Sequence, residues 1–285
     1  MKTILIGSLH PEAERVLENN TTLTKLTTEQ FYEINSSEAQ ALVLRTFTHC
    51  HKKDLDKFHH LKYIVSCSVG LDNLDLEEIK RRQIELIHCP GSNANSVAEH
   101  TLNLILSILR KNTPFAELKN KTIGIIGFGH IGRQVARKLQ GFETRIIAFD
   151  VIQPEANILN ELKVEMKPFE AVIEESDIVS VHVPLNKHTA GLISSSAFSL
   201  MKKNSFFINT SRAEVVDEPA LIAQLEAKKF RGVALDVYSE NLKLAAVKYN
   251  HLILTDHAAA QGEDSFREQC LQPVNKLIEK LDNKY

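Results

Sequence analysis

A glycine-rich segment at residues 127–132, with the sequence G-F-G-H-I-G, has the spacing of a loop that binds phosphate groups. It follows an apolar run at 122–126, which predicts a strand, and precedes residues 133–139, which predict a helix. A second apolar run then ends at Asp150. A strand, a G-x-G-x-x-G turn, a helix and an acid at the end of the next strand form the pattern that binds a dinucleotide.

Each position in this pattern has its own physical task. Gly127 permits the tight turn, Gly129 lets the backbone approach a pyrophosphate, and Gly132 lets the helix pack on the sheet. The helix start offers unpaired N–H groups to the phosphates. Asp150 can accept hydrogen bonds from ribose hydroxyls and would repel a 2′-phosphate, and residues 151–153 include no arginine that could bind one. We therefore expect NAD rather than NADP.

Four later segments place polar side chains directly after apolar runs that predict strands. They lie at residues 182–185 (H-V-P-L), 209–213 (N-T-S-R-A), 234–238 (A-L-D-V-Y) and 256–259 (D-H-A-A). In open α/β sheets, ligands bind outside the carboxyl ends of the strands. The sequence therefore predicts that these segments gather beside the dinucleotide.

Together these segments resemble the D-isomer-specific 2-hydroxyacid dehydrogenases. Residues 70–75, G-L-D-N-L-D, and residues 93–99, in the pattern N-x-x-S-x-A-E, add to the resemblance, which runs from Arg45 to His257. It is nearest to D-3-phosphoglycerate dehydrogenases and to hydroxypyruvate or glyoxylate reductases. It implies hydride transfer between NAD(H) and a small D-2-hydroxy or 2-oxo acid.

The resemblance assigns the catalytic roles to Arg212 and His257. An arginine binds a substrate carboxylate bidentately and polarises the adjacent carbonyl better than a lysine. Hydride addition builds negative charge on the carbonyl oxygen, so a proton donor must lie within hydrogen-bonding reach, and a histidine suits this task near neutral pH. In the oxidation direction, His257 would act as the base.

The resemblance also assigns binding roles to other residues. Asp236 matches a position that contacts the nicotinamide amide. The full predicted cofactor set is Gly127, Gly129, His130, Ile131, Gly132, Asp150, Val183, Thr210, Ser211, Asp236, Ala258 and Ala259. The predicted substrate-binding residues are Arg45, Val69, Gly70 and Asn93.

The third catalytic position departs from the family pattern. The family has a glutamate five residues after the position of Asp236, where this chain has Asn241, and Glu240 lies one residue earlier. The family often has a proline before the catalytic histidine, where this chain has Asp256. An amide can orient a histidine by hydrogen bonding but adds no charge. Asn241, Glu240 and Asp256 therefore all stay candidates for the partner of His257.

This departure leaves a second hypothesis open. A protein that senses NAD(H) on a dehydrogenase scaffold, with weak or no turnover, would also retain the glycine-rich segment. The absence of the glutamate favours this alternative, and the presence of both Arg212 and His257 favours the enzyme.

Apolar runs and helical patterns alternate along the whole chain, which predicts two Rossmann-like domains, each a doubly wound parallel sheet. Ser96 and Glu99 have the spacing of a capping box, which predicts that a long helix begins there. We expect a discontinuous substrate-binding domain at residues 1–95 and 261–285 and an NAD-binding domain at 96–260. The resemblance places the active site in the cleft between the two domains.

The composition excludes several classes of protein. Hydrophobic residues make up 43% of the chain, charged residues make up 25%, and the formal net charge is −2, so neither nucleic acid nor a membrane is expected as a partner. The amino terminus lacks the long apolar region of a signal peptide, and the four cysteines are widely spaced, which favours a cytoplasmic protein. The resemblance implies a homodimer formed through the NAD-binding domain.

A group of histidines is the one feature that suggests a metal site, but its spacing matches no standard one, and we expect a solvated surface and no bound metal. The group comprises His49, His51, His59 and His60.

Overall fold

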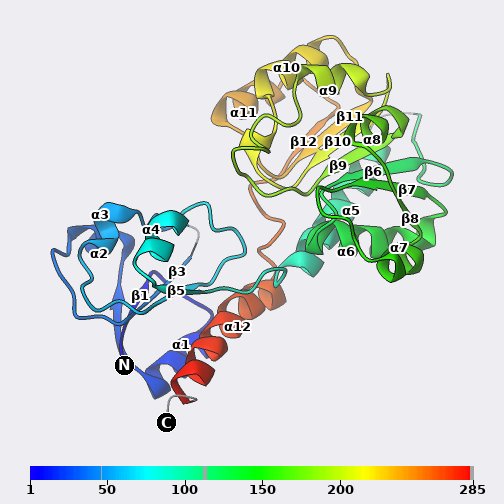
Figure 1. Cartoon of the computed structure of the whole chain (residues 1–285). Coiled ribbons are helices and arrows are strands. Elements are labelled where there is room, and N and C mark those ends of the chain that lie inside the picture. The colour runs from blue at the N-terminus through cyan, green and yellow to red at the C-terminus, as the bar shows by residue number, and fades with distance from the viewer. Residues whose placement is uncertain (46, 112–113, 283–285) are drawn as a thin grey trace. The chain divides into compact units, whose positions relative to one another are not determined.

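A computed structural model describes residues 1–45, 47–111 and 114–282 (Figure 1). The chain divides into two compact units, one formed by Met1–Asn93 with Gly262–Tyr285 and the other by Ala94–Gln261. Within the described ranges, no helix has both the length and the apolar character needed to cross a bilayer.

The first unit contains a parallel sheet of five strands in the order β2-β1-β3-β4-β5. Its strands are β1 (Lys2–Ile6), β2 (Thr22–Leu26), β3 (Ala41–Leu44), β4 (Tyr63–Ser66) and β5 (Glu85–Ile87). Its helices are α1 (Pro11–Asn20), α2 (Thr28–Glu33), α3 (Lys52–Leu55), α4 (Leu76–Arg81) and α12 (Glu263–Asp282). Helices α1 and α12 cover one face through residues such as Leu17 and Val274, and α2–α4 cover the other through residues such as Phe31.

The second unit contains a parallel sheet of seven strands in the order β12-β11-β10-β9-β6-β7-β8. Its strands are β6 (Thr122–Ile126), β7 (Arg145–Phe149), β8 (Val164–Met166), β9 (Ile178–Val181), β10 (Phe206–Asn209), β11 (Gly232–Leu235) and β12 (Leu252–Leu254). The strand order reverses between β6 and β9. This reversal is the point at which doubly wound sheets bind nucleotides.

Helices cover both faces of the second sheet. They are α5 (Ala94–Lys111), α6 (His130–Leu139), α7 (Ala156–Leu162), α8 (Phe169–Glu175), α9 (Ser195–Leu200), α10 (Glu218–Glu226) and α11 (Glu240–Ala246), with 3₁₀ turns η1 (Gln140–Phe142) and η2 (Ala213–Val215). One apolar cluster joins the sheet to α5, α6 and α7, and another joins it to α8–α11. Because both faces are covered, the central strands are short, fully buried and mostly apolar.

The predicted pair of doubly wound parallel sheets is confirmed. The sequence reasoning misses β2 and β8, which both lie at sheet edges. The predicted capping box is wrong, because α5 already begins at Ala94. The Ser96 hydroxyl instead donates to the carbonyl of Ala259 (2.8 Å), and the Glu99 carboxylate accepts from Lys138 (3.1 Å).

The histidine group does not form a metal cluster. All four of its members are exposed. Among the described residues, no three His, Cys, Asp or Glu side chains are grouped so that they could hold a metal ion.

Candidate functional site

The glycine-rich loop lies at the carboxyl end of β6 and leads into α6. Gly127 has a φ of +95°, which favours glycine, and a Cβ there would lie 2.8 Å from the carbonyl oxygen of His182. A Cβ on Gly132 would lie 2.2 Å from the carbonyl oxygen of Gly127. Gly129 differs, because a Cβ there would meet no atom within 4 Å. The first and third glycines are therefore required by packing, and the second leaves an open approach to the start of α6, as a pyrophosphate needs.

Asp150 directly follows β7 and is tied to this loop. Its carboxylate accepts hydrogen bonds from the backbone N–H of Phe128 (2.6 Å) and of Ile152 (2.9 Å), one at each oxygen. Each carboxylate oxygen can accept a second hydrogen bond. Asp150 is thus held in place with acceptor capacity left for ribose hydroxyls, and the residues present fit an NAD cofactor.

His182 follows β9, is buried and lies next to Gly127 of the glycine-rich loop. Its Nε2 lies 2.9 Å from the hydroxyl of Ser180, and its Nδ1 lies 3.4 Å from the hydroxyl of Thr210, which in turn lies 3.1 Å from that of Thr101. Burial lowers the pKa of His182 to about 3, so the ring is neutral. A neutral ring at the carboxyl ends of β9 and β10 holds these two strand ends together without adding charge.

The turn that carries Arg212 is fixed by Asn209 at the end of β10. The amide oxygen of Asn209, which is 1% exposed, accepts from the backbone N–H (3.0 Å) and the hydroxyl (2.7 Å) of Ser211. Its amide nitrogen donates to the carbonyl of Arg212 (3.0 Å). The guanidinium of Arg212 donates from Nη1 to the carbonyl of Ser211 (2.9 Å). The side chain of Arg212 is therefore presented from a constrained backbone.

The loop that carries His257 is fixed by Asp236 at the end of β11. The carboxylate of Asp236 accepts from the hydroxyl of Thr255 (2.5 Å) and from the backbone N–H of Ala258 (2.8 Å) and Ala259 (3.0 Å). The N–H of His257 donates to the carbonyl of Asp236 (2.9 Å). His257 itself is exposed and has a φ of +50°. Several hydrogen bonds thus hold an otherwise unfavourable backbone conformation at this residue.

Four hydrogen bonds outweigh the cost of burying Asp236. Burial raises the pKa of its carboxyl. Hydrogen bonds lower this pKa by more than burial raises it, so that the net pKa is below its usual range. The donors are His100, the hydroxyl of Thr255 and the backbone N–H groups of Ala258 and Ala259. The carboxylate is therefore charged at neutral pH.

The candidates for the third catalytic position differ in their surroundings. Glu240 and Asn241 are exposed in the first turn of α11, which is capped by Ser239. The carboxylate of Asp256 accepts from the hydroxyl of Tyr238 and lies 3.8 Å from Nζ of Lys243. Burial and the hydrogen bond with Asp256 raise the pKa of Tyr238 to about 12, so its hydroxyl stays protonated. Asp256 therefore already has a donor and a cation as partners.

The predicted substrate-binding residues belong to the first unit and follow β3, β4 and β5. The guanidinium carbon of Arg45 lies 4.6 Å from the ring centre of Phe266, and its buried Nε has no hydrogen-bond partner among the described residues. Val69 and Gly70 are half-buried. The buried Oδ1 of Asn93 also lacks a partner within the described part of the chain.

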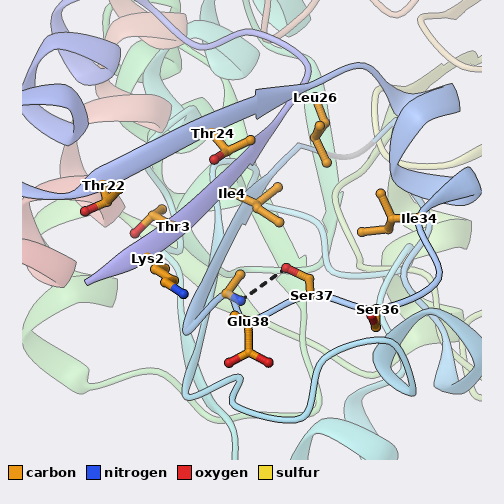
Figure 2. Close-up of a pocket in the computed structure, with 11 residues that line it drawn as sticks. Lys2, Thr3, Ile4, Thr22, Thr24, Leu26, Ile34, Ser36, Ser37 and Glu38 are labelled. Atoms are coloured by element: carbon orange, nitrogen blue, oxygen red, sulfur yellow. Dashed lines mark hydrogen bonds between the residues drawn. The ribbon is translucent and has the colours of Figure 1, made fainter.

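A separate pocket of about 370 Å³ lies in the first unit, beside β1 and β2 (Figure 2). Its lining includes the apolar Ile4, Leu26 and Ile34 and the charged Lys2 and Glu38. Its one hydrogen bond drawn in Figure 2 joins the N–H of Ala39 to the Ser37 hydroxyl. It includes none of the residues to which the sequence assigns a role.

Sequence reasoning assigns no individual role to two polar residues of the second unit. Asn209 lies within a predicted segment, and its position directly after an apolar run is a signal that could have identified it. His100 lies on α5, and no sequence signal connects it with Asp236, from whose Oδ1 its Nε2 is separated by 3.3 Å.

Comparisons with known proteins identify the family of the chain. The NAD binding domain model of the D-isomer specific 2-hydroxyacid dehydrogenases matches residues 94–259. The chain belongs to this family. As in the family, it is an NAD-dependent oxidoreductase that acts on CH–OH groups, so the predicted family, cofactor and class of reaction are confirmed.

Individual members of the family match most of the chain. A hydroxypyruvate reductase of Thermotoga maritima is 30% identical over 86% of this chain and 85% of its own length. A D-3-phosphoglycerate dehydrogenase of Methanocaldococcus jannaschii is 31% identical over 93% of this chain, which spans 54% of that enzyme. The structure of a D-lactate dehydrogenase of Aquifex aeolicus with NAD and lactic acid has a TM-score of 0.86 at 25% identity, and the match covers 99% of this chain and 96% of that one.

The buried neutral state of His182 predicts that acid destabilises the protein. Its pKa is lowered by folding, so its contribution is complete above the ordinary histidine value of about 6.5 and is lost as pH falls toward about 3. At pH 5 this loss amounts to about 2 kcal/mol. Urea unfolding at pH 7.5 and pH 5 should show a smaller pH effect in His182→Gln than in the wild type. His188→Gln, at an exposed site, should behave like the wild type, and an unchanged pH effect in His182→Gln would contradict the assignment.

Proposed function

We propose that the protein reduces a small 2-oxo acid to a D-2-hydroxy acid, or runs the reverse reaction, with Arg212 and His257 as its catalytic residues. One observation carries this proposal: the glycine-rich loop, the Arg212 turn and the His257 loop follow the carboxyl ends of parallel strands in one sheet. Parallel strands place such segments at the same edge. NAD(H), held by the glycine-rich loop and Asp150, supplies or accepts the hydride.

The two catalytic side chains have complementary tasks. The guanidinium of Arg212 binds the substrate carboxylate and polarises the neighbouring carbonyl. The imidazole of His257 donates a proton to the carbonyl oxygen as negative charge develops there, and takes it back in oxidation. Its exposure leaves the ring accessible to a substrate. In this proposal, the cofactor is lined by Val183, Thr210, Ser211, Ala258 and Ala259.

The unit at Ala94–Gln261 binds NAD, and the other unit supplies substrate-binding residues. A homodimer formed through the NAD-binding unit is part of the proposal, and exposed apolar side chains of that unit, Leu106 and Phe115, support it. A cytoplasmic location is supported by the four cysteines, which are all free and buried.

Replacing Arg212 tests the central assignment. Arg212→Ala should lower kcat/KM roughly a hundredfold or more, because losing a charge-assisted pair costs about 3 kcal/mol when its partner stays desolvated. NADH oxidation measured with pyruvate, glyoxylate, hydroxypyruvate, 2-oxoglutarate and 3-phosphohydroxypyruvate provides the readout. NADH affinity should change little. Arg137→Ala, which removes an exposed arginine of α6, serves as the control.

Near-normal turnover of every accepted acid by Arg212→Ala would show that the site is wrongly assigned. If the wild type bound NADH but reduced none of the acids, the NAD(H)-sensing alternative, which the presence of Asn241 favours, would replace the enzyme proposal.

The third catalytic position is assigned to Asn241, with Glu240 as the alternative. A carboxylate beside a histidine favours the protonated ring that reduction requires, and an amide does not supply that charge. Asn241→Glu should therefore raise kcat for reduction at neutral pH several-fold, by roughly 1 kcal/mol of electrostatic stabilisation. Glu240→Gln should leave kcat unchanged. A large loss in Glu240→Gln, with no gain in Asn241→Glu, would instead make Glu240 the partner.

The substrate carries a second anionic group in this proposal, and Arg45 binds it. The buried Nε of Arg45 has no partner among the described residues, so donors remain for a phosphate or carboxylate. Arg45→Ala should raise KM for 3-phosphohydroxypyruvate at least tenfold, by about 1.4 kcal/mol or more, and change KM for glyoxylate less than twofold. Steady-state kinetics on both acids decide the matter, and equal effects on both would refute it. Arg15→Ala, at an exposed arginine of α1, is the control.

A further inference from the structure

His100 connects helix α5 with the loop that carries His257. Its Nε2 lies 3.0 Å from the hydroxyl oxygen of Thr255 and 3.3 Å from Oδ1 of Asp236. The side chain of His100 is 17% exposed and that of Asp236 is 1% exposed, so solvent replaces these contacts poorly. The three side chains come from α5, from the end of β11 and from the residue after β12.

The direction of each hydrogen bond follows from the chemistry of the groups. The carboxylate of Asp236 can only accept, so the hydroxyl of Thr255 donates to its Oδ1 (2.5 Å). Since that hydroxyl has a single proton, its oxygen must accept from His100. Nε2 of His100 therefore carries a proton, which it shares between Thr255 and Asp236.

The two oxygens of Asp236 are used unequally. Oδ1 accepts from the hydroxyl of Thr255 and the N–H of Ala258 and lies 3.3 Å from Nε2 of His100, whereas Oδ2 accepts from one group of the described residues, the N–H of Ala259. Most of the contacts that hold the loop are therefore made to Oδ1. Oδ2 can accept a further hydrogen bond, as a contact with the carboxamide of the nicotinamide would require.

We propose that His100 is a positioning residue for the reaction: by orienting Thr255 and Asp236, it holds the loop in the conformation that presents the imidazole of His257. This inference rests on the proposed role of His257. The loop depends on such support because His257 has a φ of +50°, a conformation that non-glycine residues adopt at a cost. Without His100, the hydroxyl of Thr255 is free to rotate, and the N–H groups of Ala258 and Ala259 lose a fixed acceptor.

Three variants test the proposal by kinetics. His100→Ala should lower kcat for 2-oxo acid reduction by roughly ten- to a hundredfold, since small displacements of a catalytic group have effects of this size. KM for the acid should change less, because Arg212 is untouched. His100→Gln, whose Nε2 can also donate, should recover most of kcat. Asn103→Ala, at an exposed position of the same helix, should match the wild type.

Amide hydrogen exchange provides a readout that does not depend on turnover. In His100→Ala, the N–H groups of His257, Ala258 and Ala259 should exchange at least several-fold faster, while exchange in β6 and β10 stays unchanged. His100→Gln should restore protection. If the wild type reduced no 2-oxo acid, the proposed function would fail, and exchange would still decide whether His100 holds the loop.

Two results would overturn the inference. One is a His100→Ala variant with normal kcat and normal exchange in the loop. The other is an equal loss of kcat in His100→Ala and His100→Gln with a lowered Tm in both, which would show a general packing role and no orienting hydrogen bond.

Discussion

A carboxylate buried at the end of a strand has to be surrounded by hydrogen-bond donors, and Asp236 meets this requirement with groups drawn from a single loop and one helix. The donors are the hydroxyl of Thr255, the N–H groups of Ala258 and Ala259, and the ring of His100. Because desolvating a charge without partners costs several kcal/mol, the loop and the carboxylate fix each other. The position of the His257 loop therefore depends on the buried carboxylate of Asp236.

At the ends of the neighbouring strands β9 and β10, the buried polar side chains that fix the backbone are neutral. His182 is buried and neutral, because burial lowers its pKa to about 3. Its ring contacts the hydroxyls of Ser180 and Thr210. Asn209 fixes the Arg212 turn with an uncharged amide. The buried side chains at this edge thus include one hydrogen-bonded anion, Asp236, and several neutral groups. Arg212, which is half-buried, and His257, which is exposed, are the two residues to which the proposal assigns the charge that acts on the substrate.

Sequence reasoning succeeds where the relevant contacts are local. The glycine-rich loop, α6 and Asp150 lie within one strand–helix–strand unit, so spacing alone predicts them. It fails where partners are distant: His100 and Thr255 are 155 residues apart, and no pattern in the chain connects them. The Ser96–Glu99 spacing misleads for the same reason, since the Ser96 hydroxyl binds a carbonyl 163 residues away. The edge strand β2 is missed because its residues are mostly polar and exposed, so it lacks the apolar run that marks an inner strand.

The two departures from the family pattern have different physical consequences. A proline before the catalytic histidine would restrict the backbone covalently, and Asp256 does not. In its place, the hydroxyl of Tyr238 binds the carboxylate of Asp256, so that the segment after β11 holds the His257 loop at a second point besides Asp236. The Tyr238–Asp256 hydrogen bond thus restrains the backbone at the position where the family often has a proline. It does not replace the charge of the family's glutamate, because the Asp256 carboxylate is already engaged by Tyr238 and lies near Lys243. Tyr238 and Asp236 therefore both hold the His257 loop, but neither contact supplies a charge at the position of the family's glutamate.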